Sequence, residues 1–205
     1  MTRPVPPFEK SVFINCPFDS DYQDLMLAIV FSVAAHGFVP RTARESEGDP
    51  EPRFSRILRM ISQCKYSIHD LSRSTGEGGD NLARFNMPLE LGMVAAFRFD
   101  REMSEQTPHR WLALVPEGYG YQRFISDLAG FDPARHDSSV QSVIREVSAW
   151  LRTLEDVLDP VPSALKIFEN FQSFRSQLAD LRTEALNKDT WADVLLAASQ
   201  TVPRP

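Results

Sequence analysis

The sequence reads KYSIHDLS at residues 65–72 and NMPLELGM at residues 86–93. The first segment has the length and apolar content of a buried strand, and the segment between the two is rich in glycine, which favours a loop. Asn86 can cap a following helix, and Pro88 fits the first turn of that helix, where a missing N–H costs nothing. The stretch therefore predicts a strand end, a loop and a helix start.

Glu90 falls in the first turn of this predicted helix, close to the carboxyl end of the preceding strand. Open α/β sheets bind their ligands at that edge. Because the positive end of a helix dipole favours an ionised carboxylate, we expect Glu90 to be charged. A simpler alternative is that Glu90 only completes a helix cap.

Strand patterns alternate with helix patterns along residues 11–154. Buried strands are predicted at residues 11–16, 65–71 and 110–115, a weaker strand at 38–43, and a possible edge strand around Phe131. Helices are expected to open at Asp19 or Ser20, at Asp49 with Pro50, near Asn86, and at Ser138 or Ser139. Alternation of this kind predicts an α/β fold with a flavodoxin-like, mostly parallel sheet of four or five strands flanked by helices.

The C-terminal part has a different pattern. Prolines at 160 and 162 predict a hinge after the α/β domain of residues 1–158. In the helical segment 159–205, apolar residues recur in alternating steps of four and three, a spacing typical of coiled-coil seams. This stripe must cover either its own domain or another subunit, and the spacing favours a helix partner. We therefore expect segment 159–205 to be an oligomerisation element of a homo-oligomer, with the stripe made of Ile167, Phe171, Phe174, Leu178 and Leu181.

Bulk properties narrow the class of protein. The chain of 205 residues carries a net charge of −6, and its pI of about 5.3 argues against a general binder of nucleic acid or membrane surfaces. There is no apolar run of the roughly 20 residues that span a membrane and no signal-peptide pattern, so we expect a cytoplasmic protein. Cys16 and Cys64 are expected to be buried without a disulfide. The histidines have no metal-ligand spacing, so no metal site is predicted.

Several short motifs resemble two related families. Phe13-Ile14-Asn15, the strand at 67–72 that ends in Leu-Ser, and the later Glu90 resemble the Toll/interleukin receptor (TIR) domain pattern. In members of that family that hydrolyse NAD, a glutamate on the helix after this strand is catalytic. The turn at residues 15–18 and Glu90-Leu91-Gly92 also resemble the nucleoside 2-deoxyribosyltransferases, where the glutamate is a nucleophile. The combination is similar to an uncharacterised bacterial TIR-like group.

The resemblance implies cleavage of an N-glycosidic bond in NAD or a related nucleotide or nucleoside, in the setting of bacterial antiphage or stress signalling. It assigns the catalytic role to Glu90, with NAD or the nucleotide as substrate and no cofactor. Asn15 and Phe18 would contact sugar or base, Asp70 would hold ribose hydroxyls or orient Glu90, and Arg44 would lie near a phosphate. The transition state of this reaction is a sugar oxocarbenium ion, which an ionised carboxylate stabilises or attacks.

Other interpretations remain open. Met87-Pro88-Leu89 replaces the TIR Trp-Cys pair, and Arg84 stands where the transferases carry an acidic base-binding residue. A non-catalytic TIR-like module for nucleotide sensing or protein interaction is therefore the competing class. His69 has a structural alternative, and Asp70 can instead accept loop amides. The arginines of the second helix can form a solvated face, although Arg41, Arg44 and Arg53 near strand ends can also meet a phosphate.

Overall fold

The computed structural model describes residues 6–46, 48–73, 85–104, 106–118, 120–123, 125–188 and 190–203. The predicted glycine-rich loop, with Arg84, lies outside the described residues. Inside them, a five-stranded sheet has the order β2-β1-β3-β4-β5, and all its pairs are parallel. The strands are β1 Ser11–Asn15, β2 Val39–Arg41, β3 Tyr66–Asp70, β4 Arg110–Pro116 and β5 Ala134–His136. The predicted parallel, flavodoxin-like α/β fold is confirmed, with β1, β3 and β4 at its centre.

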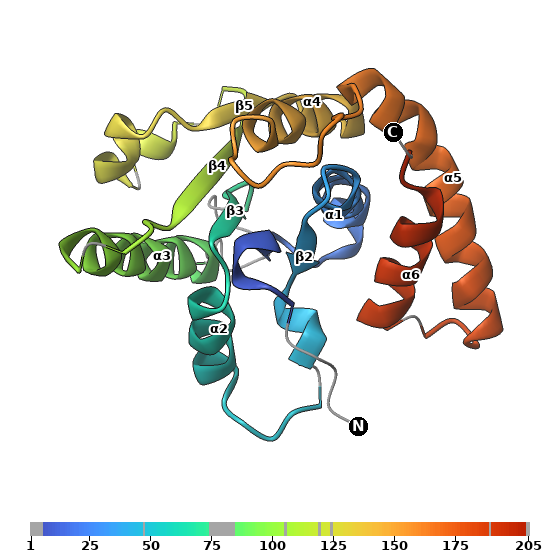
Figure 1. The fold of residues 1–205 in the computed structure, drawn as a ribbon, viewed down its shortest axis with the longest axis horizontal. Helices are drawn as coiled ribbons and strands as arrows, with labels where there is room; N and C mark the ends of the chain where they lie inside the picture. Colours follow the sequence, from blue (N-terminus) through green and yellow to red (C-terminus); the bar gives the residue numbers. More distant parts are fainter. Residues whose placement is uncertain are drawn as a thin grey trace, which may run out of the picture.

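Helices cover both faces of the sheet (Figure 1). Helices α1 and α4 pack on one face, α2 and α3 pack on the other, and α5 and α6 lie together beside α1. The helices are α1 Gln23–Ala35, α2 Arg53–Ser62, α3 Asn86–Met103, α4 Val140–Leu151, α5 Ala164–Glu184 and α6 Trp191–Thr201. Short 3₁₀ helices occur at Phe8–Lys10, Ser20–Tyr22, Ala43–Ser46, Tyr121–Arg123 and Ser126–Gly130.

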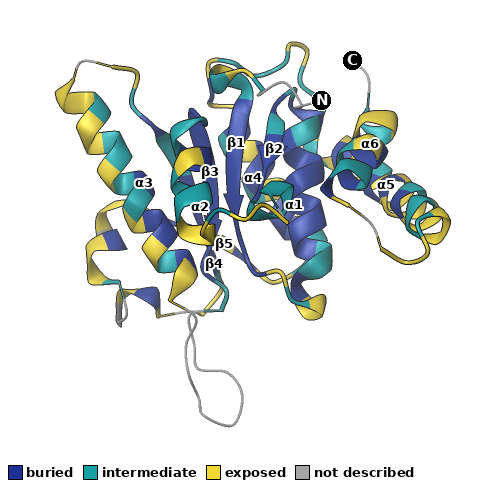
Figure 2. Cartoon of the chain, turned by 90° about the horizontal axis from the view of Figure 1, so that it is seen from below, coloured by how far each residue is buried: buried dark blue, intermediate teal, exposed yellow. Residues whose placement is uncertain are grey.

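The strands are buried between these layers, as Figure 2 shows for β1 and β3. Successive side chains of a strand point to opposite faces. Val12 and Ile14 therefore join the cluster under α1 and α4, whereas Phe13 joins the cluster under α2 and α3. Because both faces are covered, β1 sends buried apolar side chains into both layers.

Several predicted boundaries need correction. Helix α2 begins at Arg53 after Pro52 and not at Asp49 with Pro50, and the edge strand lies at Ala134–His136 and not around Phe131. Helix α3 does begin at Asn86, but Phe85 occupies the cap position and no side chain caps the helix. The predicted serine cap of α4 is confirmed, since Ser139 accepts a backbone N–H, and Ser163 caps α5 in the same way.

Gly37 follows the end of α1. Its φ of +80° is a left-handed conformation that glycine adopts without strain. The N–H groups of Gly37 and Phe38 bond back to Ala34 and Val33 and so satisfy carbonyls at the helix end. A Cβ at Gly37 would also lie 2.9 Å from the Cβ of Leu158. The position therefore requires glycine for both its backbone angle and its close contact with the chain that leads to α5.

The apolar stripe of α5 is buried within the chain itself. Phe174 stacks on Phe31 of α1 at a ring distance of 4.8 Å, and Phe171 lies 6.1 Å from the same ring. Ile167, Phe171, Phe174 and Leu178 all belong to one core cluster with α1, α4 and α6. The helix partners that the four-three spacing indicated are thus α1, α4 and α6 of the same chain. This burial removes the stripe as an argument for an oligomer, and the oligomeric state itself stays a prediction.

Two further sequence expectations concern cysteines and membranes. Cys16 and Cys64 are buried and unpaired, as predicted. Among the described residues, none of the helices combines the length and apolar character that a membrane crossing requires.

Replacing Phe174 with alanine tests how the C-terminal helices are held. The ring is fully buried against Phe31, so its loss should lower the free energy of unfolding by about 3–5 kcal/mol. Leu165→Ala on the same helix is the control, because Leu165 is 63% exposed and its removal should cost less than about 0.5 kcal/mol. Urea denaturation measures both. Equal, small effects would contradict the packing of α5 on α1.

Candidate functional site

The strand order creates a crevice at the carboxyl edge of the sheet. Strand β1 leads to α1 on one face, and its neighbour β3 is followed by α3 on the other face. Where adjacent strands lead to opposite faces, the loops diverge and leave room for a ligand. The residues after β1 and at the starts of α2 and α3 therefore surround the expected binding position.

Asn15, the last residue of β1, connects three elements at this edge. Its side-chain Nδ2 donates to the carbonyl of Met87 in α3 at 2.9 Å and lies 3.0 Å from Nδ1 of His69 in β3. The amide is 4% exposed, so these bonds are shielded from water. Asn15 thus attaches the first turn of α3 to the sheet, three residues before Glu90.

The hydrogen bonds of Asn15 continue through a series of buried side chains, and each bond in the series has a defined donor and acceptor. A carbonyl only accepts, so the amide nitrogen of Asn15 faces Met87 and donates, and Nδ1 of His69 must accept. Neutral His69 then carries its proton on Nε2, which donates to the Ser67 hydroxyl at 2.9 Å. That hydroxyl donates in turn to Nε2 of His109 at 3.0 Å. Burial lowers the pKa of His69 to about 3 and that of His109 to about 4, so both rings are neutral near pH 7. This geometry favours a structural role for His69.

Glu90 lies just past the first turn of α3 and not within it as predicted. It is the fifth residue of the helix, beyond the first turn, and it is 5% exposed. It faces Arg53, the first residue of α2, whose guanidinium nitrogen is 3.8 Å from Glu90 Oε1. Burial raises the pKa of Glu90 to about 7, and the charge of Arg53 only partly opposes this rise. The expectation that the helix dipole keeps Glu90 ionised is therefore wrong.

The pKa of Glu90 is raised because both groups that favour its charged form, the helix dipole and Arg53, act weakly on it. The dipole effect falls off beyond the first turn, and Glu90 lies past it. The Arg53 side chain is 52% exposed, so solvent weakens its field. Burial of the Glu90 carboxyl removes water from it, and this desolvation raises its pKa. Glu90 is consequently a carboxyl that exchanges its proton near neutral pH.

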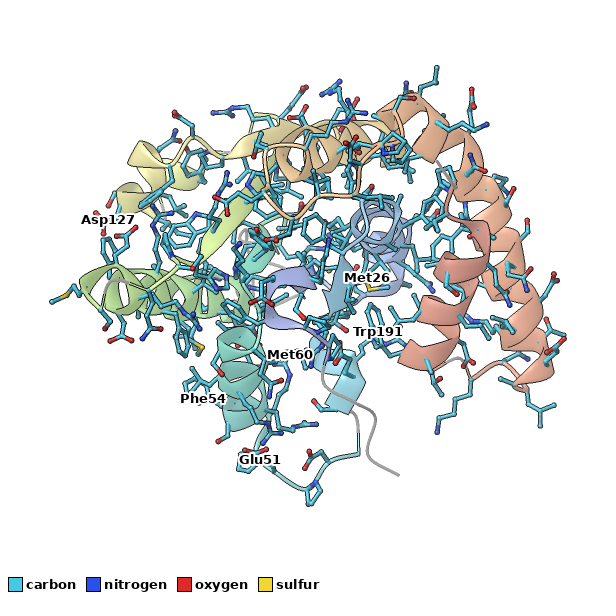
Figure 3. All side chains as sticks on the ribbon, viewed as in Figure 1. Met26, Glu51, Phe54, Met60, Asp127 and Trp191 are labelled. Atoms are coloured by element: carbon cyan, nitrogen blue, oxygen red, sulfur yellow. The ribbon has the colours of Figure 1, made fainter. Side chains whose placement is uncertain are left out.

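Two adjoining hollows open beside Glu90, and Arg53 lines both. The arginine hollow, of about 310 Å³, is lined by Arg44, Arg53 and Arg56 with Phe18, Gln23 and Met26 among its other residues. The Glu90 hollow, of about 200 Å³, is lined by Glu90, Arg53, Phe54, Ile57, Leu89 and Met93 with Asn86. Figure 3 labels Phe54 on α2, where it is half exposed, and Met26 on α1. Phe18 and Arg44 thus share one hollow, and Glu90 opens on the next.

Asp70 and Asn15 line neither hollow. Asp70 is fully buried on the α1 and α4 face, where its Oδ1 accepts the backbone N–H of Ser72 at 2.8 Å. Its Oδ2 lies 3.1 Å from Nε2 of His136 in β5, and Nδ1 of that ring accepts the Ser138 N–H at 3.2 Å. Because Nδ1 accepts this N–H, any proton of the ring that points toward Asp70 is on Nε2. The alternative in which Asp70 accepts loop amides fits this geometry.

The arginines of α2 divide into two groups that the sequence could not separate. Arg53 and Arg56 line the arginine hollow, whereas Arg59 pairs with Asp49 and Glu51. Arg41, at the end of β2, is held by Glu45 at 2.7 Å. The available signal was the position of Arg53 at a helix start, since helices of a parallel sheet begin at its carboxyl edge. Arg56, one turn later, carried no such signal.

Comparisons with protein-family models and with curated proteins found no match for this chain.

Replacing Glu90 with glutamine tests its raised pKa through stability. Between pH 4.5 and about 7 the unfolded chain has lost the Glu90 proton and the folded chain still holds it, so wild-type stability falls as pH rises through this range. Glu90→Gln removes that fall. The variant should match wild type near pH 4 and exceed it by roughly 3 kcal/mol at pH 8.

Urea denaturation across this pH range provides the measurement. Glu102→Gln, a partly exposed position on the same helix, is the control and should give a curve parallel to wild type. If the Glu90→Gln curve also runs parallel to wild type, the pKa of Glu90 is not raised.

Proposed function

We propose that this protein cleaves the N-glycosidic bond of NAD or a related nucleotide or nucleoside, with Glu90 as the catalytic carboxylate. The observation that carries the proposal is the position of Glu90: a buried carboxyl that opens on a hollow at the switch point of a parallel sheet. A single carboxylate in a desolvated site is the group that this chemistry requires.

The reaction demands little else from the protein. As the bond between the anomeric carbon and the base lengthens, the base leaves with the bonding electrons and positive charge develops on the sugar. Ionised Glu90 stabilises that charge or attacks the anomeric carbon, and water or another acceptor then completes the substitution. Because only ionised Glu90 can act in this way, the rate should rise with pH through the pKa of about 7.

The neighbouring side chains suit the ends of such a substrate. Phe54, Leu89 and Met93 give the Glu90 hollow an apolar wall against which a planar base can lie. Phe18 and Arg44 line the next hollow, where Arg44 can meet a phosphate. Asn15 and Asp70 contact protein groups in this proposal, and they act by holding the crevice in shape.

The TIR-like or deoxyribosyltransferase-like assignment is part of the same proposal. The parallel sheet order agrees with the fold that both families imply. A role in bacterial antiphage or stress signalling, a cytoplasmic location and a homo-oligomeric state belong to the proposal as well. With the α5 stripe buried, an oligomer would have to use other surfaces, such as the exposed Leu165 and Phe168.

A non-catalytic TIR-like module for nucleotide sensing or protein interaction is the second candidate. The exposed apolar side chains around the Glu90 hollow favour it, because Phe54, Phe85 and Leu89 are each more than half exposed. NAD consumption by the pure protein separates the two candidates, since a binding module leaves NAD intact.

Glu90→Gln is the direct test of catalysis. It keeps the shape of the side chain and removes the charge, so cleavage of NAD or a nucleotide should fall at least about 100-fold. Chromatography of the released base measures the rate, and Glu102→Gln is the control that should keep wild-type turnover. Wild-type rates in the Glu90→Gln protein would refute the assignment. A wild-type protein that cleaves neither NAD nor nucleosides at high concentration would favour the binding module.

A further inference from the structure

The 3₁₀ helix Ala43–Ser46, the 43–46 helix, follows β2 and forms part of the wall of the arginine hollow. Its first two residues, Ala43 and Arg44, line that hollow. The Thr42 hydroxyl accepts the backbone N–H of Arg44 at 3.2 Å, and the Thr42 carbonyl accepts that of Glu45 at 3.0 Å. A helix of four residues gains few hydrogen bonds for the dihedral angles that it fixes, so it is not stable by itself. Its position therefore depends on the elements that pack against it.

Two side chains of the α/β domain hold the second half of the 43–46 helix. Glu45 Oε2 accepts from Nε of Arg41 in β2 at 2.7 Å. A guanidinium N–H of Arg56 in α2 donates to the backbone carbonyl of Ser46. These bonds connect the 43–46 helix to the sheet and to α2.

Helix α6 is a third neighbour, and it comes from the C-terminal part of the chain. It contacts both the 43–46 helix and α1. Trp191, its first residue, is 5% exposed and belongs to the same core cluster as Met26 of α1, which lines the arginine hollow. Figure 3 labels Trp191 on the side of α6 that faces the 43–46 helix. Helix α6 thus lies behind two of the elements that line the hollow.

The indole of Trp191 also acts on Glu45. Burial raises the pKa of Glu45, and this rise is opposed mainly by Arg41 and, more weakly, by the indole N–H. Trp191 Nε1 is buried and has no partner at hydrogen-bonding distance among the described residues. Its effect on Glu45 is therefore that of a nearby dipole, and the large apolar ring supplies most of the contact.

We propose that Trp191 is a positioning residue of the site, which holds the 43–46 helix and with it the Arg44 side of the arginine hollow. Helices α5 and α6 then serve as the support of this wall. The support stands on the packing alone. Its consequence for a substrate rests on the proposed function, in which Arg44 meets a phosphate.

This role affects binding and not the chemical step. The 43–46 helix lines the arginine hollow, whereas Glu90 is carried by α3 and opens on the other hollow. A contact with the phosphate end of a substrate is present in both the ground state and the transition state, so its loss raises KM and leaves kcat unchanged. A general loss of stability would instead lower the fraction of active enzyme and so lower the apparent kcat.

Hydrogen exchange followed by mass spectrometry tests the wall without requiring turnover. In Trp191→Ala, the amides of residues 43–46 should exchange at least about tenfold faster than in wild type, while those of β4 keep their rates. Trp191→Leu keeps part of the apolar volume, so it should give a smaller change in the same direction and replaces Trp191→Ala if that variant does not fold. Leu196→Ala, at a position of α6 that is 44% exposed, is the control and should match wild type. Unchanged exchange at 43–46 in the folded Trp191 variants, or an equal acceleration in β4, would overturn the proposal.

Steady-state kinetics with NAD tests the consequence for a substrate. Trp191→Leu should raise KM at least about fivefold and keep kcat within about twofold of wild type, and Leu196→Ala should change neither. A lower kcat at the wild-type KM would overturn the positioning role. Faster exchange at 43–46 in a protein that cleaves neither NAD nor nucleosides would refute the proposed function and leave the support of the wall intact.

Discussion

The side-chain amide of Asn15 determines where the rest of the crevice lies. By donating to the Met87 carbonyl and to His69, it joins the end of β1, the centre of β3 and the first turn of α3. Every polar partner in the chain behind it is neutral and buried, so the connection does not depend on salt or on pH near neutrality. Glu90 follows Met87 by three residues, and its position opposite Arg53 is a consequence of this anchor.

Asp70 and Glu90, two carboxyl groups near this edge of the sheet, lie in different environments and so have different roles. Asp70 is fully buried, accepts the backbone N–H of Ser72 and lies 3.1 Å from the His136 ring, so its contacts are with the fold itself. Glu90 lies 3.8 Å from the half-exposed Arg53, and the burial of its carboxyl raises its pKa to about 7. A carboxyl whose burial shifts its pKa and which opens on a hollow is characteristic of functional sites.

The sequence predicted the fold well because its signals were local. Apolar runs bounded by proline and glycine marked the central strands, and Ser139, Ser163 and Gly37 marked helix ends by their own chemistry. The packing partner of the apolar stripe on α5 is distant in the sequence. The spacing of the stripe indicated a helix partner, but only the tertiary fold identifies that partner as Phe31 and its neighbours. Likewise, Phe18, Arg44 and Glu90 could be placed near strand ends. The depth of Glu90, the orientation of Asp70 and the separation of Arg56 from Arg59 depend on packing between distant segments.

The titration of the Glu90 carboxyl itself is the measurement closest to these conclusions. Carbon-detected NMR of protein labelled at glutamate side chains, with Glu90→Gln used to assign the signal, gives the midpoint directly. Burial opposed by Arg53 predicts a midpoint near pH 7 and a higher midpoint in Arg53→Gln. A midpoint near the ordinary value of 4.5, unchanged in Arg53→Gln, would contradict both the burial of Glu90 and its interaction with Arg53.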